Sequence, residues 1–212
     1  MRIGLIVTPI AGLGGAAGLK GTDGAGVPAL ALQRGAEPLS GRRAAEALRV
    51  ALSELATPLE ILTVAGAMGG EAARAAGMSP TLLGLRAGDP TTRGDTMAIA
   101  SALIDAGVDL ILFAGGDGTA RDVVSVTGET VPVLGIPTGV KMHSAVFATS
   151  PASAGRLVAM LASASDSRIA LAPREVMDID EDELRAGVVS ASLHGYGLVP
   201  VERRMMQPAK GA

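Results

Sequence analysis

The chain has 212 residues, of which 48% are hydrophobic and 18% charged, and its formal net charge is −3. A chain of this length buries about 70% of the surface that its unfolded form exposes, so a substantial core is expected. Aromatic residues make up only 1% and the charge is slightly negative, which argues against a nucleic-acid-binding module. Cysteine is absent, which excludes disulfides and thiolate metal sites.

The amino-terminal apolar run, residues 3–7, is too short for a secretion signal or a membrane span, so we expect a cytoplasmic protein. Short apolar runs then alternate with segments of helical periodicity. The predicted strands, each apolar throughout, cover residues 2–7, 59–64, 81–85, 108–114 and 131–136. The predicted helices cover residues 41–56, capped by Ser40, a segment from Thr92 or Asp95 to Gly107, the stretch after residue 118, and residues 150–165.

Residues 9–35 are predicted to form a glycine-rich loop. Strands that alternate with helices and are apolar throughout indicate an α/β fold, with a parallel sheet covered by helices on both faces. We expect this domain to span residues 1–167.

From residue 168 onward the pattern changes to two stretches that alternate like antiparallel strands. We predict that residues 168–212 are the beginning of a β-rich second domain that is incomplete in this chain. Two strands are marginally stable alone, and their edges and apolar face need cover. We therefore predict a homodimer that pairs through this segment, the alternative being that it folds back on its own α/β domain. The apolar side chains that need cover are Ile169, Leu171, Val176, Val188, Leu193, Leu198 and Val199.

Three glycine loops are candidates for the active site. The first, GLGGAA at residues 12–17, matches a dinucleotide-binding pattern through Gly12 and Gly14. That pattern should begin directly after a strand, whereas four residues separate this one from residue 7. A Rossmann dehydrogenase is therefore the weaker interpretation, and a surface loop is the alternative.

The second loop, GGDGT at residues 115–119, follows a strand and precedes a helix, so it lies at the carboxyl edge of the sheet, where α/β proteins bind ligands. Bare glycines and a helix amino terminus favour a phosphate. A carboxylate would repel phosphate, so Asp117 indicates either a cation or a hydroxyl proton to be taken. A tight turn with Asp117 as a helix cap explains the spacing equally well. The candidate binding residues here are Gly115, Gly116, Gly118, Thr119, Arg121 and Asp122.

The third loop follows the strand at 131–136 and adds basic and hydroxyl side chains at the same sheet edge. An acidic loop beside a basic one suits a substrate that carries phosphates and a hydroxyl. His143 by itself is weak support, because a lone histidine is more often structural. The candidate binding residues of this loop are Pro137, Thr138, Gly139, Lys141 and Ser144.

The GGDGT loop in this strand–helix setting, followed by GIPTGVKMHSAVFA at 135–148, resembles the NAD kinase superfamily. That superfamily also includes the diacylglycerol kinases, the sphingosine kinases and, more distantly, the phosphofructokinases. The opening IGLIVTPIAGLGG and the later PREVMDID are similar to its branch of predicted ATP- or polyphosphate-dependent NAD kinases, which includes the acetoin-catabolism X proteins. Two features depart from the superfamily pattern: Thr8 stands where asparagine is usual, and the Asn-Glu pair that grips the dinucleotide has no match.

The resemblance implies phosphoryl transfer from ATP or polyphosphate to the 2′-hydroxyl of NAD, with Mg²⁺, in a site between an α/β domain and a β-rich one. It implies that Asp117 takes the hydroxyl proton and is a possible metal ligand, and that the surrounding loop holds nucleotide. Arg121 and Lys141 are candidates for neutralising phosphate charge. It also implies that the chain is the front part of a longer protein. The alternatives are a nucleotide-binding module without turnover, and a kinase of a lipid or another alcohol.

Overall fold

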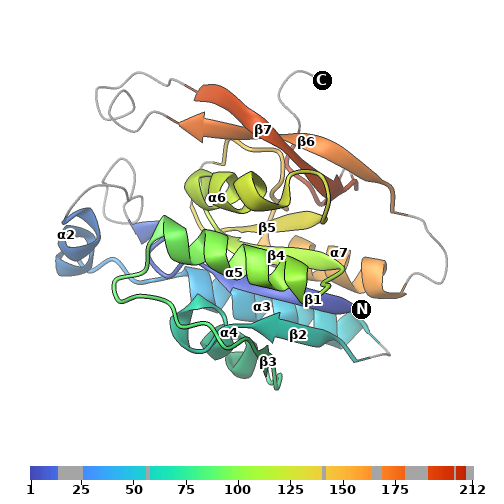
Figure 1. Ribbon diagram of the computed structural model, residues 1–212, viewed down its shortest axis with the longest axis horizontal. Helices are drawn as coiled ribbons and strands as arrows, with labels where there is room; N and C mark the ends of the chain where they lie inside the picture. The colour runs from blue at the N-terminus through green and yellow to red at the C-terminus, as the bar shows by residue number, and fades with distance from the viewer. Residues whose placement is uncertain are drawn as a thin grey trace.

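Five parallel strands form the central sheet of the computed structural model, which describes residues 1–13, 26–55, 58–139, 142–163, 169–179, 191–202 and 204–208. Their order in the sheet is β3-β2-β1-β4-β5 (Figure 1). The strands are β1 (Arg2–Val7), β2 (Glu60–Thr63), β3 (Thr81–Leu82), β4 (Leu110–Gly115) and β5 (Val133–Pro137).

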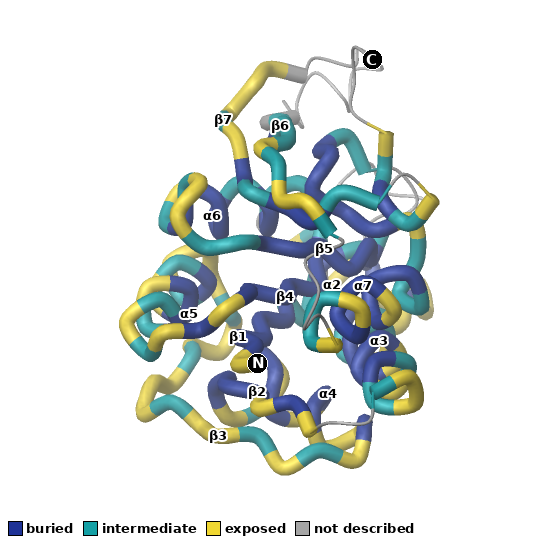
Figure 2. Tube along the Cα trace, turned by 90° about the vertical axis from the view of Figure 1, so that its right-hand side faces the viewer, coloured by how far each residue is buried: buried dark blue, intermediate teal, exposed yellow. Residues whose placement is uncertain are grey.

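Helices cover both faces of this sheet, which confirms the predicted α/β class (Figures 1 and 2). One face carries α3 (Ser40–Glu54), which contacts both α4 (Gly70–Ala75) and α7 (Pro151–Ser163). The other face carries α5 (Arg93–Asp105) and α6 (Asp117–Thr127), which contact each other. Among the described residues, no helix is both long and apolar enough to cross a membrane.

The core is aliphatic apart from two phenylalanines. Every residue of β4 is buried, as expected for a parallel strand covered on both faces. Phe113 on β4 meets Phe147, from the segment after β5, with ring centroids 5.4 Å apart and planes at 68°. This edge-to-face arrangement is one that aromatic pairs prefer. Gly135 on β5 makes room for it, because a Cβ there would collide with the ring of Phe147.

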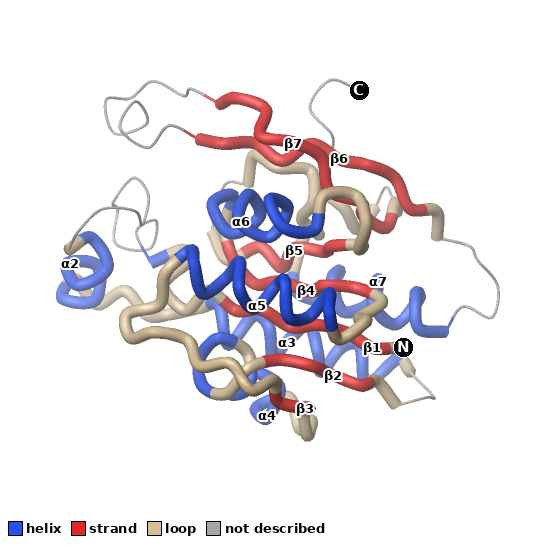
Figure 3. Tube along the Cα trace, in the orientation of Figure 1, coloured by secondary structure: helices blue, strands red, loops and turns tan. Residues whose placement is uncertain are grey.

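The two predicted carboxyl-terminal strands form an antiparallel hairpin, β6 (Leu171–Ile179) and β7 (Ala191–Pro200). The hairpin packs on α6 and β5 (Figure 3). A Cβ at Gly197 would lie 2.9 Å from Val124 of α6, so a glycine permits this close approach. Val176 and Val199 are fully buried. Of the hairpin's large apolar side chains, those of Leu171, Leu193 and Tyr196 are exposed. Val188 and the domain boundary predicted at residue 167 lie outside the described residues.

Three local predictions were wrong. Residues 27–33, expected to be loop, form the short helix α2 (Val27–Gln33). Residues 66–75, for which no element was predicted, contain η1 (Gly66–Met68) and α4. The strand expected at 81–85 is only the two residues of β3. Ser40 does not cap α3: the helix begins at Ser40, and its buried hydroxyl donates instead to the carbonyl of Ala11 at 3.0 Å. That hydrogen bond satisfies a buried carbonyl of the loop after β1.

Candidate active site

Three loops meet at the carboxyl edge of the sheet. In the sheet, β2 and β3 lie on one side of β1, and the later strands β4 and β5 lie on the other side. The strand order therefore reverses between β1 and β4, where open α/β sheets form a binding crevice. We call residues 8–13 after β1 the first loop, residues 115–119 at the end of β4 the second loop, and the described residues 137–139 and 142–144 at the end of β5 and after it the third loop. Gly14 and Lys141 lie outside the described residues.

The carboxylate of Asp117 is held by the backbone of the third loop. The N–H of Ser144 donates to Oδ1 at 2.8 Å, and the N–H of His143 lies 3.1 Å from Oδ1 and 3.0 Å from Oδ2. Asp117 is the first residue of α6, yet no side chain caps this helix, whose cap position is Gly116. The alternative interpretation of Asp117 as a helix cap is therefore wrong. The carboxylate is oriented across the gap between two loops, and the residue remains partly exposed.

The second loop is also joined to the first. The hydroxyl of Thr119 is 3.1 Å from the hydroxyl of Thr8, the residue that directly follows β1. Thr119 is buried, with 6% of its surface exposed. The threonine that departs from the superfamily pattern thus has a structural partner within GGDGT.

The first and third loops touch as well. Gly12 has φ +84°, a left-handed conformation that favours glycine, and a Cβ there would collide with the carbonyl oxygen of Thr138. The N–H of Thr138 donates to the carbonyl of Gly115 at 3.2 Å. Thr138 is 2% exposed, and its hydroxyl finds no hydrogen-bond partner within the described part of the chain. The described residues of the three loops are therefore in contact with one another.

The glycines of the second loop differ in whether the packing around them leaves room for a side chain. Gly115 is required by packing, because a Cβ there would collide with the side chain of Thr119. A Cβ at Gly116 would meet no atom within 4 Å, and one at Gly118 would meet only the tip of Arg121 at 3.9 Å. Neither residue has a positive φ. The fold itself therefore does not require Gly116 and Gly118 to be glycine, and the space above them is open to a ligand.

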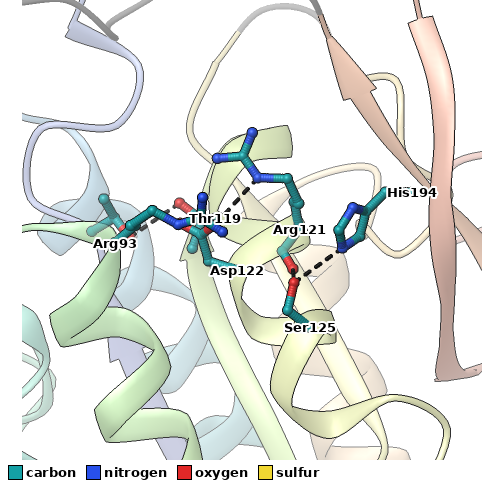
Figure 4. Close-up of polar contacts among 7 residues, drawn as sticks. Arg93, Thr119, Arg121, Asp122, Ser125 and His194 are labelled. Atoms are coloured by element: carbon teal, nitrogen blue, oxygen red, sulfur yellow. Dashed lines mark hydrogen bonds and ion pairs between the residues drawn. The ribbon is translucent and has the colours of Figure 1, made fainter.

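Asp122, three residues after Thr119 of the second loop, forms ion pairs with two arginines (Figure 4). Its carboxylate is buried, and Oδ1 lies 3.2 Å from Arg93 Nη2 and 3.3 Å from Arg121 Nε. Arg93 is the first residue of α5, so this ion pair connects the two helices on one face of the sheet. One turn further along α6, the hydroxyl of Ser125 donates to the carbonyl of Arg121 and lies 3.0 Å from Nε2 of His194 on β7.

The remaining candidate residues lie in the third loop and are held differently. The carbonyl of Pro137 accepts a 2.7 Å hydrogen bond from Arg43 of α3. The hydroxyl of Ser144, predicted as a ligand, accepts the N–H of Met177 on β6 at 3.0 Å, so its backbone rather than its hydroxyl faces Asp117. Gly139 lines a cavity beside this loop.

Two cavities flank the three loops. One, of about 520 Å³, lies at the ends of β1 and β2 and has Ile10, Met68 and Arg86 in its walls. The other, of about 600 Å³, lies between α3, the third loop and the start of α7. Within the described ranges, no group of three His, Asp or Glu side chains gathers that could hold a metal ion.

Sequence reasoning did not identify Arg43 and Arg93 as neighbours of the site. Each joins residues that are distant in sequence: Arg43 reaches Pro137, and Arg93 reaches Asp122. No local motif marks either arginine, because both belong to ordinary helix-forming segments. Only the packing of α3 and α5 on the sheet brings them to the loops.

Comparison with known proteins agrees with this geometry. The family model of the ATP-NAD kinase N-terminal domain matches residues 3–164, a range that includes the sheet and all three loops. No curated protein and no solved structure gives a significant match.

Proposed function

Because the chain belongs to the ATP-NAD kinase family, whose N-terminal domain it contains over residues 3–164, we propose that it phosphorylates the 2′-hydroxyl of NAD to give NADP. The family is one of nucleotide-binding phosphotransferases, and NAD as the acceptor is the finer step of the proposal. The observation that carries it is the oriented carboxylate of Asp117 between Gly116 and Gly118, whose missing side chains leave open space. The assignment to the ATP- or polyphosphate-dependent branch stays a prediction.

In this proposal Asp117 acts as the general base. The 2′-hydroxyl gives its proton to the carboxylate while its oxygen bonds to the terminal phosphorus of the donor. The bond from that phosphorus to the bridging oxygen breaks, and the shortened donor leaves with the electron pair. The N–H groups of His143 and Ser144 support the role, because they fix the carboxylate in one orientation before the substrate arrives.

Charge neutralisation is the second requirement of phosphoryl transfer. The first turn of α6 presents backbone N–H groups and the positive end of the helix dipole to the open space. We propose Arg121 and Lys141 as cations for the phosphates. Mg²⁺ fits this donor set, because it is commonly bound by one or two carboxylates together with substrate phosphates, and Asp117 would supply the carboxylate. Bound there, the metal would neutralise charge on the transferred group.

The cavity of about 520 Å³ beside the first loop suits the nucleoside of the donor. Ile10 and Met68 offer apolar walls, and the cavity opens at the same sheet edge as the second loop. Sites of this size with apolar walls and a few polar groups are typical of nucleotide-sized ligands.

The test is a donor and acceptor panel with the purified chain and Mg²⁺. NAD is incubated with ATP or with polyphosphate, and the nucleotides are separated to detect NADP. Labelled ATP is offered in parallel to a sphingoid base and to diacylglycerol. NADP formation supports the proposal, whereas labelling of lipid without NADP would reassign the acceptor. Calorimetric binding of NAD without any NADP would instead identify a nucleotide-binding module.

A further inference from the structure

The cavity between α3, the third loop and α7 has a concentration of positive charge that the proposed reaction does not use. The cavity has a volume of about 600 Å³, and its walls include Arg42, Arg43 and Arg49 of α3. Among the described residues that line it, Glu46 is the one acidic residue. The whole chain is slightly acidic, with a net charge of −3. Positive charge is therefore gathered at this place rather than being general to the surface.

Two of these arginines have N–H donors that are not used in hydrogen bonds within the described part of the chain. Arg43 uses one N–H on the carbonyl of Pro137 at 2.7 Å, and Arg49 uses one on the carbonyl of Ala75 at 3.0 Å. Each guanidinium has five N–H donors, so most of them remain available. Within the described part of the chain, neither Arg43 nor Arg49 forms an ion pair with a carboxylate. Backbone carbonyls hold them in place without neutralising them.

The guanidinium of Arg42 is nearly as available to an anion as those of Arg43 and Arg49. It lies 3.9 Å from Glu37, and the two side chains are 75% and 78% exposed. An exposed pair at this distance contributes little free energy, so an anion of higher charge displaces it readily. Arginine is also the residue best suited to phosphate, because its planar fork donates two hydrogen bonds at once.

The spacing of the arginines sets the size of the ligand. Arg42 and Arg49 are seven residues apart on one helix, which separates them by about 10 Å along its axis. A single phosphate cannot contact both ends of such a row, whereas a linear chain of phosphates can. The first residues of α7 close the cavity at its other wall, and this 13-residue helix adds the positive end of its dipole.

We propose that this cavity is a binding site for a chain of linked phosphates, between α3 and the third loop, with walls that do not include Asp117. The shared chemistry is a polyphosphate anion, either free or as the tail of a nucleoside triphosphate. Arg43 connects the cavity to the third loop through Pro137, and the third loop holds the carboxylate of Asp117. A bound anion would therefore restrain the segment that orients Asp117. The arginines of this site have no part in the proposed NAD kinase reaction, although Pro137 and Gly139 of the third loop also line the cavity.

The experiment is titration calorimetry of the 212-residue chain with tripolyphosphate, and separately with ATP, in the absence of metal. We expect one tripolyphosphate per chain, and about a tenfold or greater loss of affinity in the double variant Arg42→Gln/Arg49→Gln. Both side chains are exposed, so the variant should fold. Arg156→Gln is the matched control, because this exposed α7 arginine pairs with Glu54 and does not line the cavity.

The outcomes separate this site from the proposed function. Asp117→Asn should bind tripolyphosphate as tightly as the natural chain does, even if NADP formation is lost or never observed. Binding of ATP with the same dependence on Arg42 and Arg49 supports the site with a nucleotide tail as its ligand. Binding of tripolyphosphate alone supports it with a free chain. Absence of tripolyphosphate binding, or equal affinity in the double variant and the natural chain, would overturn the inference.

Discussion

The backbone N–H of Ser144 donates a 2.8 Å hydrogen bond to Oδ1 of Asp117, across 27 residues of sequence. It connects the start of α6 to the loop after β5, and the same loop continues into contact with the hairpin through the hydroxyl of Ser144 and the N–H of Met177. A change at the hairpin can therefore reach the carboxylate through one residue. The proposed base is fixed by the backbone N–H groups of residues 143 and 144, which every residue type except proline has.

Substitution of Gly118 separates ligand binding from folding. It is the second residue of α6, where alanine is the better helix former, and its Cβ would have room. We expect Gly118→Ala to keep or raise the free energy of unfolding, by up to ~1 kcal/mol. We expect NADP formation to fall by about tenfold or more, because the methyl group occupies the space above the loop.

Gly41→Ala is the control for that variant. Gly41 is the second residue of α3, and a Cβ there would also meet nothing within 4 Å. It should show the same change in stability by urea unfolding while leaving NADP formation intact. If Gly118→Ala were as active as Gly41→Ala, the space above the second loop would not be a substrate site.

The contact between the first and third loops is tested by Gly12→Ala. The methyl group meets the Thr138 carbonyl and the backbone has a positive φ, so we expect a loss of about 1 to 3 kcal/mol in stability and a lower rate of NADP formation. Gly35→Ala has a similar φ of +80° but open space around its Cβ. It should lose about 1 to 2 kcal/mol from backbone strain alone and keep its activity. Equal activity in the two variants would show that the loop contact does not matter for the site.

The carboxyl group of Asp95 is expected to make the stability of the fold depend on pH. Hydrogen bonds from the Thr92 hydroxyl first, and then from the N–H groups of Gly88 and Thr92, lower the pKa of the Asp95 carboxyl below its ordinary value of 3.8. Because the folded-state pKa lies below the unfolded-state one, the stabilisation is present above pH 3.8 and is lost as the pH falls through the folded-state pKa. Urea unfolding should therefore show Asp95→Asn less stable than the natural chain at neutral pH, with the difference shrinking in acid. A difference that does not change with pH would contradict this.

The assembly remains a proposal: a homodimer that pairs through the exposed face of the hairpin. The hairpin buries Val176 and Val199 against its own domain, yet Leu193 and Tyr196 are 52% and 45% exposed. Light scattering of the 212-residue chain should give the mass of a dimer, and Leu193→Ser should shift the equilibrium toward the monomer. A monodisperse monomer of the natural chain would rule the dimer out.

The sheet was predictable because its signals are local. Strand β4 is a run of apolar residues that stops at two glycines, and the prediction of 108–114 differs from Leu110–Gly115 only at its ends. Either Thr92 or Asp95 was predicted to open α5; Thr92 is its cap, and the carboxylate of Asp95 completes the capping box. Helix α2 was missed because it is seven residues long, begins with a proline near its first turn and lies between glycines. Such short segments form through contacts rather than through their own propensity.

The site was predictable in its position but not in its contacts. The loop residues could be placed at one sheet edge, since parallel strands end together. That Asp117 would bind the backbone at 143 and 144, or that Gly12 would lie against Thr138, could not be predicted, because these pairs are far apart in sequence. The sequence marked Gly115, Gly116 and Gly118 alike, and only the packing shows that the first serves the fold and the others leave space.

The central claim is that Asp117 takes the proton of the NAD 2′-hydroxyl. The most direct measurement compares NADP formation by the natural chain and by Asp117→Asn, with NAD, ATP and Mg²⁺ at saturating concentrations. The amide still accepts a backbone hydrogen bond but is a far weaker base, so the rate should fall by about 100- to 10,000-fold. The unfolding transition of each protein is recorded alongside to establish that both are folded. Unchanged turnover in a folded Asp117→Asn variant would contradict the account.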